Sequence, residues 1–135
     1  MRQYIFEKGN PSLSYIAKNW PRSKYLLKKF VLSNHKKPDF YKICTNCLKD
    51  LNVLKLSGYA PILKKLSKLS SKNFTYNSYH DQHHFKSVIL ISCLLAKLSK
   101  FKSNEDKILL VIIALTHDLN HQGRRIINIP YYQED

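Results

Sequence analysis

The sequence predicts an all-α protein, and three observations support this fold class. Only three of the 135 residues are glycine, so few turns need a positive φ angle. Apolar residues recur at spacings of three and four along much of the chain, which is the pattern of amphipathic helices. Two later stretches, VILISCLLA and ILLVIIAL, are apolar enough to be buried helices. With 44% hydrophobic residues, the chain can build a core of about one domain.

The first predicted helix follows an irregular N-terminal segment. Residues 1–22 are expected to be irregular, because they contain a Gly-Asn-Pro turn and end in a break at Trp20-Pro21. Proline is favoured in the first turn of a helix, where its missing N–H costs nothing. Pro21 therefore fits an early helical position, and the amphipathic segment 23–33 (SKYLLKKFVLS) is predicted to be a short helix.

Two further helices are predicted in the middle of the chain. Residues 34–39 (NHKKPD) form a loop, and Asp39 can cap a helix over 40–56 through its carboxylate. Ser57-Gly58 then ends that helix. Residues 61–70 (PILKKLSKLS) begin with proline and carry lysines on one side, so they indicate another amphipathic helix.

The character of the chain changes after a polar stretch at 70–78 (SSKNFTYNS). A serine followed three residues later by an aspartate occurs twice there, which is the pattern of a capping box. These boxes predict helices over about 79–100 and about 104–119, with Gly123 as a stop signal just beyond. The two boxes are Ser78 with Asp81 and Ser103 with Asp106.

Charge divides the chain into a basic region at 1–75 and a nearly neutral region at 76–135. Residues 1–72 hold 16 Lys and Arg against three Asp and Glu, whereas residues 73–135 hold seven against six. Such a basic half could attract nucleic acid or an anionic membrane surface. Because the lysines are scattered along the sequence and do not form long consecutive runs, a solvated protein surface is the favoured interpretation.

Cysteine usage and the lack of a leader predict a reduced, cytoplasmic protein. The three cysteines are an odd number, and the segment MRQYIFEKGN has no apolar signal-peptide core. No apolar run reaches the roughly 18 residues that a membrane span needs. Cys44 and Cys47 form a C-x-x-C pair, but they lie within an apolar helical pattern and no second ligand pair is near. Both are therefore predicted to be core residues.

Geometry predicts a histidine cluster at one end of the last two helices. Two helices joined by a short turn pack antiparallel. From that turn, His84 lies about 27 Å back and His117 about 23 Å forward at about 1.5 Å per residue. The start of one helix is thus expected beside the end of the other. Imidazoles and a carboxylate gathered there favour a transition-metal site, whereas His83 is favoured as an exposed helix residue. The clustered residues are His80, His83, His84, His117, Asp118 and His121.

Two motifs here resemble a known family. Residues 79–88, YHDQHHFKSV, resemble the Y-H-N-x-x-H-x-x-x-V motif of class I cyclic-nucleotide phosphodiesterases, and residues 117–123, HDLNHQG, resemble their H-D-x-D-H-x-G motif. That family belongs to the HD-domain superfamily of metal-dependent phosphohydrolases. The resemblance covers about 76–123. It implies a helical bundle of HD/phosphodiesterase type that is incomplete at the C-terminus, with 76–135 as the front half of the catalytic domain.

The resemblance also implies roles for individual residues. Matching positions make His80 the general acid, His84 and His117 ligands of a zinc-like ion, and Asp118 a ligand that relates it to a second, magnesium-like ion. The implied cofactors are Zn²⁺ with Mg²⁺ or Mn²⁺. Asn120 replaces an aspartate of the family motif, and the family's further ligand, a downstream Asp, has no counterpart here. The resemblance also places His121 near the second ion. Arg124 and Arg125 could contact the phosphate, but exposed charges in a turn are their more ordinary interpretation.

The implied reaction is hydrolysis of a 3′,5′-cyclic nucleotide to the 5′-monophosphate. Because the front half of a site is present, completion by a missing C-terminal half or by a second subunit is expected, and weak or absent turnover is expected for this chain alone. Two other classes stay open. One is a non-catalytic remnant that binds metal, and the other is a basic helical module that binds nucleic acid or an anionic surface.

Overall fold

The computed structural model describes residues 12–33, 38–53, 55–72, 82–100 and 103–119. Within these ranges the protein is helical and has no strand, which confirms the predicted all-α class. None of the described helices combines the length and the apolar character that crossing a bilayer requires. The helices are α1 (Leu13–Lys18), α2 (Lys24–Val31), α3 (Phe40–Asp50), the 3₁₀ helix η1 (Leu56–Tyr59), α4 (Ala60–Ser71), α5 (Gln82–Leu98) and α6 (Asn104–Thr116).

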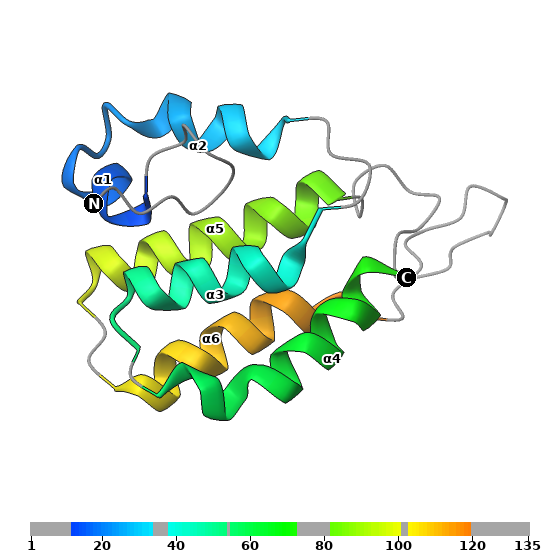
Figure 1. The fold of residues 1–135 in the computed structure, drawn as a ribbon. Helices are drawn as coiled ribbons and strands as arrows, with labels where there is room; N and C mark the ends of the chain where they lie inside the picture. Colours follow the sequence, from blue (N-terminus) through cyan, green and yellow to red (C-terminus); the bar gives the residue numbers. More distant parts are fainter. Residues whose placement is uncertain (1–11, 34–37, 54, 73–81, 101–102, 120–135) are drawn as a thin grey trace, which may run out of the picture.

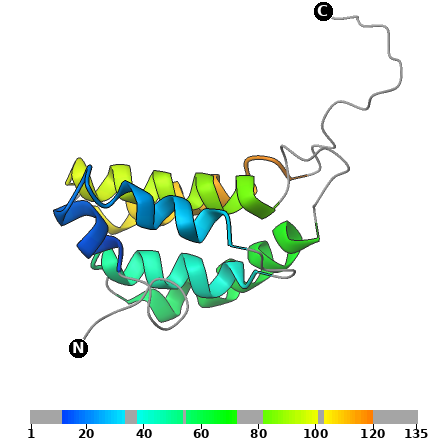
Figure 2. The same cartoon turned by 90° about the horizontal axis from the view of Figure 1, so that it is seen from above.

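The helices form two layers with a shared long axis. Helices α3 and α4 make one layer and α5 and α6 the other, as Figure 2 shows. Helices α1 and α2 pack against α5. The chain reverses between α3 and α4 and again between α5 and α6 (Figure 1). As predicted, the last two helices therefore pack antiparallel. The end of the bundle that holds the starts of α3 and α5 and the ends of α4 and α6 is called the site end below.

The core lies between the layers and consists of aliphatic, aromatic and cysteine side chains. All three cysteines are free and fully buried, so Cys44 and Cys47 are core residues as predicted. Burial raises the pKa of the Cys44 thiol, and a hydrogen bond with Cys93 together with burial raises that of Cys47. Protonated, buried thiols are poor metal ligands. The largest fully buried side chains include Phe40, Phe85, Leu48, Leu63, Ile89, Leu90 and Leu115.

Two of the predicted helix caps are present in the structure. The Asp39 carboxylate accepts a hydrogen bond from the Lys42 N–H at 3.0 Å, which satisfies a donor at the start of α3. At the start of α6, the Ser103 hydroxyl accepts from the Asp106 N–H at 3.3 Å. The other predicted box, at 78–81, lies outside the described residues.

The segment before α2 departs from the sequence prediction in two ways. Residues 1–22 were expected to be irregular, yet α1 forms within them, capped by the Ser12 hydroxyl, which accepts from the Tyr15 N–H at 3.2 Å. Its Leu13 and Ile16 side chains are fully buried, so tertiary packing stabilises a helix too short to stand alone. Pro21 is not in a helix, because the chain turns through 19–23 before α2 begins.

The predicted helix over 40–56 is shorter than expected. Helix α3 ends at Asp50, and Asn52 adopts a left-handed conformation with φ of 61°. The Val53 N–H donates to the Leu48 carbonyl at 3.0 Å, and the Asn52 N–H to that of Lys49 at 2.9 Å. This pattern is a Schellman cap, which asparagine tolerates nearly as well as glycine. Asn52, and not Ser57-Gly58, is therefore the stop signal.

Lysine side chains from the other layer complete the end of α3. The Lys97 ammonium donates to the Asp50 carbonyl at 2.6 Å, and the Lys107 ammonium donates to that of Leu51 at 2.7 Å. These carbonyls have no partner within the helix. Cations also interact favourably with the negative end of a helix dipole. Hence two charged residues of α5 and α6 are structural ties between the layers.

A third lysine, Lys86, closes the end of α2 in the same way. Its side chain is fully buried, and its ammonium donates to the Ser33 carbonyl at 2.9 Å and to the Phe30 carbonyl at 3.3 Å. The ammonium also lies 5.1 Å from the centroid of the Phe30 ring, which adds a cation–π contact. Part of the large positive charge of the chain is thus used inside the fold.

The outward face of the α5–α6 pair is apolar and exposed. It carries no charged residue between Val88 and Leu95 on α5 or between Ile108 and Thr116 on α6. Five of its aliphatic side chains are between 42% and 57% exposed, which is unusual for neighbouring positions on two packed helices. They are Ile91, Leu95, Leu98, Leu109 and Ile113.

Asp50 gives the fold a testable pH dependence. The residue is 5% exposed, and burial raises the pKa of its carboxyl above the ordinary 3.8, although hydrogen bonds from Leu13 and Ser14 and the charge of Lys97 lower it. A raised folded-state pKa stabilises the fold fully below the unfolded pKa, and this contribution is lost as pH rises through the folded value.

We therefore expect the stability advantage of the wild type over Asp50→Asn to be largest below pH 3.8 and to shrink as pH rises above it. Urea unfolding of both proteins at several pH values measures this difference. The asparagine retains an oxygen that can accept the Leu13 N–H, so the comparison isolates the titration. A difference that stayed constant with pH would contradict the assignment.

Candidate metal centre

Three of the predicted site residues meet at the site end of the bundle. His84 lies in the first described turn of α5, His117 caps the end of α6, and Asp118 is the next residue. The antiparallel packing of α5 and α6 brings these two helix ends together (Figure 1). A separation of 33 residues along the chain therefore becomes direct contact between side chains.

The three side chains converge on one point. His84 Nε2 lies 3.1 Å from His117 Nε2 and 3.0 Å from Asp118 Oδ2. His117 Nε2 lies 2.9 Å from the same carboxylate oxygen. The side chains of His84, His117 and Asp118 are 16%, 26% and 12% exposed, so the point is partly screened from water but open on one side.

One hydrogen bond fixes what His117 can offer at this point. Its Nδ1 lies 2.8 Å from the Ala114 carbonyl oxygen, which can only accept, so Nδ1 carries a proton. In the neutral ring, Nε2 then presents a lone pair towards Asp118 Oδ2. Two acceptors facing each other at 2.9 Å need a cation between them. A proton or a metal ion must therefore be shared among these groups.

The distances between the donor atoms fit a metal ion. Two neighbouring ligands of an octahedral ion lie about 3.0 Å apart for bonds of about 2.1 Å, and those of a tetrahedral zinc ion lie about 3.3 Å apart. The observed separations of 2.9 to 3.1 Å match one face of the octahedron and are shorter than the tetrahedral value. Two imidazoles and one carboxylate are also a donor set that divalent transition metals accept, with positions left for water or substrate.

An aromatic wall supports the two histidines from inside the core. Phe85 is fully buried, and its ring centroid lies 5.7 Å from that of His117 and 6.3 Å from that of His84. Phe40 stands behind it, with ring centroids 5.9 Å apart. Such packing limits the rotamers of the imidazoles and keeps their nitrogens aimed at the same point.

The structure brings together His84, His117 and Asp118, and it does not address the other predicted site residues. His83 lies in α5 and is partly buried, which corrects its expected exposure. Sequence reasoning missed Phe85 and the Ala114 carbonyl. The Ala114 carbonyl could have been predicted from the sequence, because the side chain of a histidine at a helix end can reach the carbonyl three residues earlier. The predicted residues outside the described part of the chain are His80, Asp81, Asn120, His121, Arg124 and Arg125.

Comparison of the chain with family models, curated proteins and solved structures gives no match. The geometry of the donor atoms is therefore the structural basis for a metal centre. Three donor atoms from two helices, with one ring oriented by a backbone carbonyl, form a compact cluster with a suitable donor set.

Proposed function

We propose that the chain is part of a metal-dependent phosphohydrolase of the cyclic-nucleotide phosphodiesterase type, in which His84, His117 and Asp118 hold a divalent ion. The observation that carries the proposal is the convergence of three donor atoms within 2.9 to 3.1 Å of one another. The donors come from the two segments whose sequences resemble the family motifs. Zn²⁺ is the proposed ion at this point, with Mg²⁺ or Mn²⁺ as a second ion bridged through Asp118.

The proposed chemistry divides between the ion and the protein. A bound divalent ion supplies Lewis-acid chemistry, because it neutralises a phosphodiester and lowers the pKa of water. Asp118 adds a negative charge that compensates the ion, and the Ala114 carbonyl holds the His117 ring in its ligating tautomer. The resemblance makes His80 the donor of a proton to the leaving 3′-oxygen, a role that suits an imidazole near neutral pH.

Three protein donors leave coordination positions that water, substrate or another protein group can fill. We propose that a missing C-terminal half or a second subunit supplies a further ligand and the nucleotide-binding surface. The exposed apolar face of α5 and α6 supports this, since faces of this kind mark contacts with further protein. His121, Arg124 and Arg125 are proposed to lie near the second ion and the phosphate.

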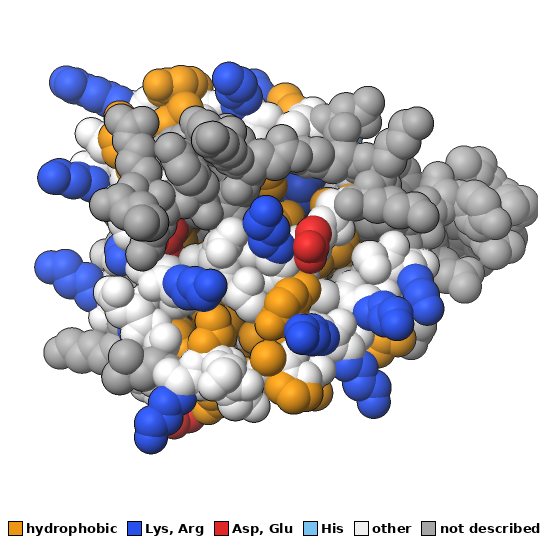
Figure 3. Space-filling view, in the orientation of Figure 1, with side chains coloured by type: hydrophobic (Ala, Val, Ile, Leu, Met, Phe, Trp, Pro, Cys, Tyr) orange, Lys and Arg blue, Asp and Glu red, His pale blue; other side chains and the backbone are white. Residues whose placement is uncertain are grey.

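A basic nucleic-acid or membrane module is the less favoured function. Figure 3 shows lysines spread over one face of the molecule instead of gathered into a single patch. Lys86, Lys97 and Lys107 serve as structural ties, which removes three cations from the surface available to such a partner.

Turnover is the test of the enzymatic proposal. Hydrolysis of bis-p-nitrophenyl phosphate and of cyclic AMP is measured with Mn²⁺ or with Zn²⁺ and Mg²⁺ for the wild type, His84→Ala and, as a matched control, His83→Ala. We expect weak or absent hydrolysis by the wild type alone; where it is measurable, activity should be unchanged in the control and fall at least about 100-fold in His84→Ala.

The alternatives give different results in the same assay. Metal bound at this cluster without any hydrolysis would exclude activity of this chain alone and favour a non-catalytic remnant. Absence of bound metal together with salt-sensitive binding to DNA or heparin would favour the basic module. Equal activity in the wild type and His84→Ala would refute the assigned site.

A further inference from the structure

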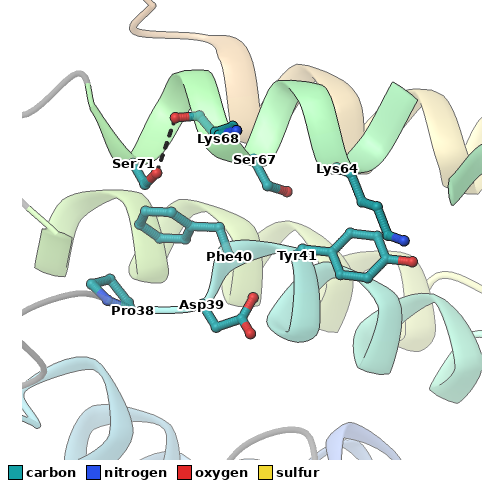
Figure 4. Close-up of a pocket in the computed structure, with 8 residues that line it drawn as sticks. All are labelled: Pro38, Asp39, Phe40, Tyr41, Lys64, Ser67, Lys68 and Ser71. Atoms are coloured by element: carbon teal, nitrogen blue, oxygen red, sulfur yellow. Dashed lines mark hydrogen bonds between the residues drawn. The ribbon is translucent and has the colours of Figure 1, made fainter. Parts of the chain in front are cut away.

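A pocket of about 290 Å³ lies between α3 and α4 at the site end of the bundle (Figure 4). Its upper wall is one face of α4, formed by Lys64, Ser67, Lys68 and Ser71. These residues are spaced by three, one and three, so they share a helix face. The pocket is close to the lower limit of volume for small-molecule sites, which suits a ligand of modest size.

Ser67 lines this pocket, and its hydroxyl has no partner among the residues that the structure describes. The residue is 5% exposed. Nearby serines of α4 behave differently, since Ser70 donates to the Leu115 carbonyl and Ser71 to the Lys68 carbonyl. In Figure 4 the Ser67 side chain is directed towards α3 and the space beside Tyr41. Buried polar groups are nearly always paired, so this hydroxyl points to a ligand.

The charges around the pocket favour an anion. Lys64 and Lys68 line it, and the start of α3 presents the positive end of an 11-residue helix. One carboxylate, that of Asp39, also lines it but already accepts the Lys42 N–H at 3.0 Å. Two lysines against one aspartate leave a local positive charge. This balance suits one anionic group and not a cation.

The floor of the pocket is aromatic. Phe40 and Tyr41 line it, and the Lys64 ammonium lies 5.4 Å from the centroid of the Tyr41 ring. The pocket is separate from the metal centre, because the rings of Phe40 and Phe85 stand between it and His117, with centroid distances of 5.9 and 5.7 Å. A ligand here would need an apolar surface to cover the rings.

We propose that this pocket binds a small organic anion with a flat apolar body. The anionic head contacts Lys64 and Lys68 and accepts a hydrogen bond from the Ser67 hydroxyl, while the flat body packs against the partly exposed Tyr41 ring. A carboxylate and a phosphate monoester share this chemistry. The site is independent of the proposed phosphohydrolase function, so either can fail without the other.

The test uses the 135-residue chain freed of metal and three probes: phenyl phosphate, benzoate and inorganic phosphate. Titrations followed by amide NMR shifts and by calorimetry compare the wild type with Ser67→Ala and with the double variant Lys64→Gln/Lys68→Gln. The matched control is Lys65→Gln/Lys72→Gln, which removes the same charge from α4 but at positions that do not line the pocket.

We expect an aromatic anion to bind the wild type in the millimolar range, as suits a probe of about ten non-hydrogen atoms. Binding should weaken at least tenfold in the double lysine variant and about threefold in Ser67→Ala, and change less than twofold in the control. The probe that binds more tightly identifies the head group as carboxylate or phosphate. In the wild type, shifts should concentrate at the start of α3 and along α4.

Three results would overturn the proposal. Equal weakening in the two double variants would mean that the probes respond only to the net charge of the chain. Inorganic phosphate binding as tightly as phenyl phosphate would mean that the aromatic floor contributes nothing. Shifts spread over all helices in the wild type would mean that no defined site exists, and this readout needs no variant to fold.

Discussion

Replacing Asp118 with alanine is expected to remove the divalent ion from the chain. One oxygen of the Asp118 carboxylate lies within 3.0 Å of Nε2 of both His84 and His117. It is the only one of the three donor groups that carries a negative charge. Without it, two neutral nitrogens 3.1 Å apart are left as donors, and no negative charge compensates the ion. Metal affinity should fall at least about 100-fold, more than second-layer changes usually cause.

Two measurements check this expectation. Elemental analysis after gel filtration gives the zinc content, which should be close to stoichiometric for the wild type and near zero for Asp118→Ala. Thermal unfolding gives a second readout, because an ion at 100 times its dissociation constant stabilises a fold by about 2.7 kcal/mol. Zinc should therefore raise the melting temperature of the wild type and leave that of the variant unchanged.

His83→Ala is the matched control, since it removes an imidazole one residue from His84 that is not one of the three donors of the cluster. Its zinc content and its stabilisation by zinc should equal those of the wild type. Unchanged metal content in Asp118→Ala would refute the assignment of the metal centre. An equal loss in His83→Ala would place the ion elsewhere among the histidines.

Features of the sequence that act over one or two helix turns predicted most of the fold. The Asp39 and Ser103 caps and the apolar stretches of α5 and α6 are local, and the structure has them where the sequence placed them. Helix α1 was missed because its stability comes from burial of two side chains against other helices. Helix α3 is shorter than predicted because Asn52, in the left-handed conformation, ends it before Ser57-Gly58 is reached.

The candidate site was predictable for a geometric reason. Nearly equal helix arms on either side of a short turn must bring the start of α5 to the end of α6, whatever packs around them. This geometry places His84 beside His117 and Asp118, but it does not determine how the two imidazole rings are oriented. The packing of Phe85 against the histidines and the hydrogen bonds from lysines to distant carbonyls depend on contacts between the layers. Residue spacing along the chain does not predict those contacts.

Replacing Phe85 with alanine is expected to lower the free energy of unfolding by about 3 to 5 kcal/mol. The ring is fully buried and packs against Phe40, His84 and His117 at the site end of the bundle. Its removal leaves a cavity between the layers and takes away the wall behind both imidazoles. Stability and metal binding should therefore fall together, which urea unfolding and zinc titration measure.

Phe85→Leu separates the two effects, because leucine fills most of the volume but lacks the flat surface. It should cost about 1 to 1.5 kcal/mol in stability and about tenfold in zinc affinity. Phe30→Leu is the control, since Phe30 belongs to the same core but is buried in α2, a helix that carries none of the three donor residues. It should cost similar stability and leave zinc affinity unchanged. If both leucine variants lost zinc affinity equally, the loss would follow from general destabilisation, and Phe85 would have no positioning role at the metal centre.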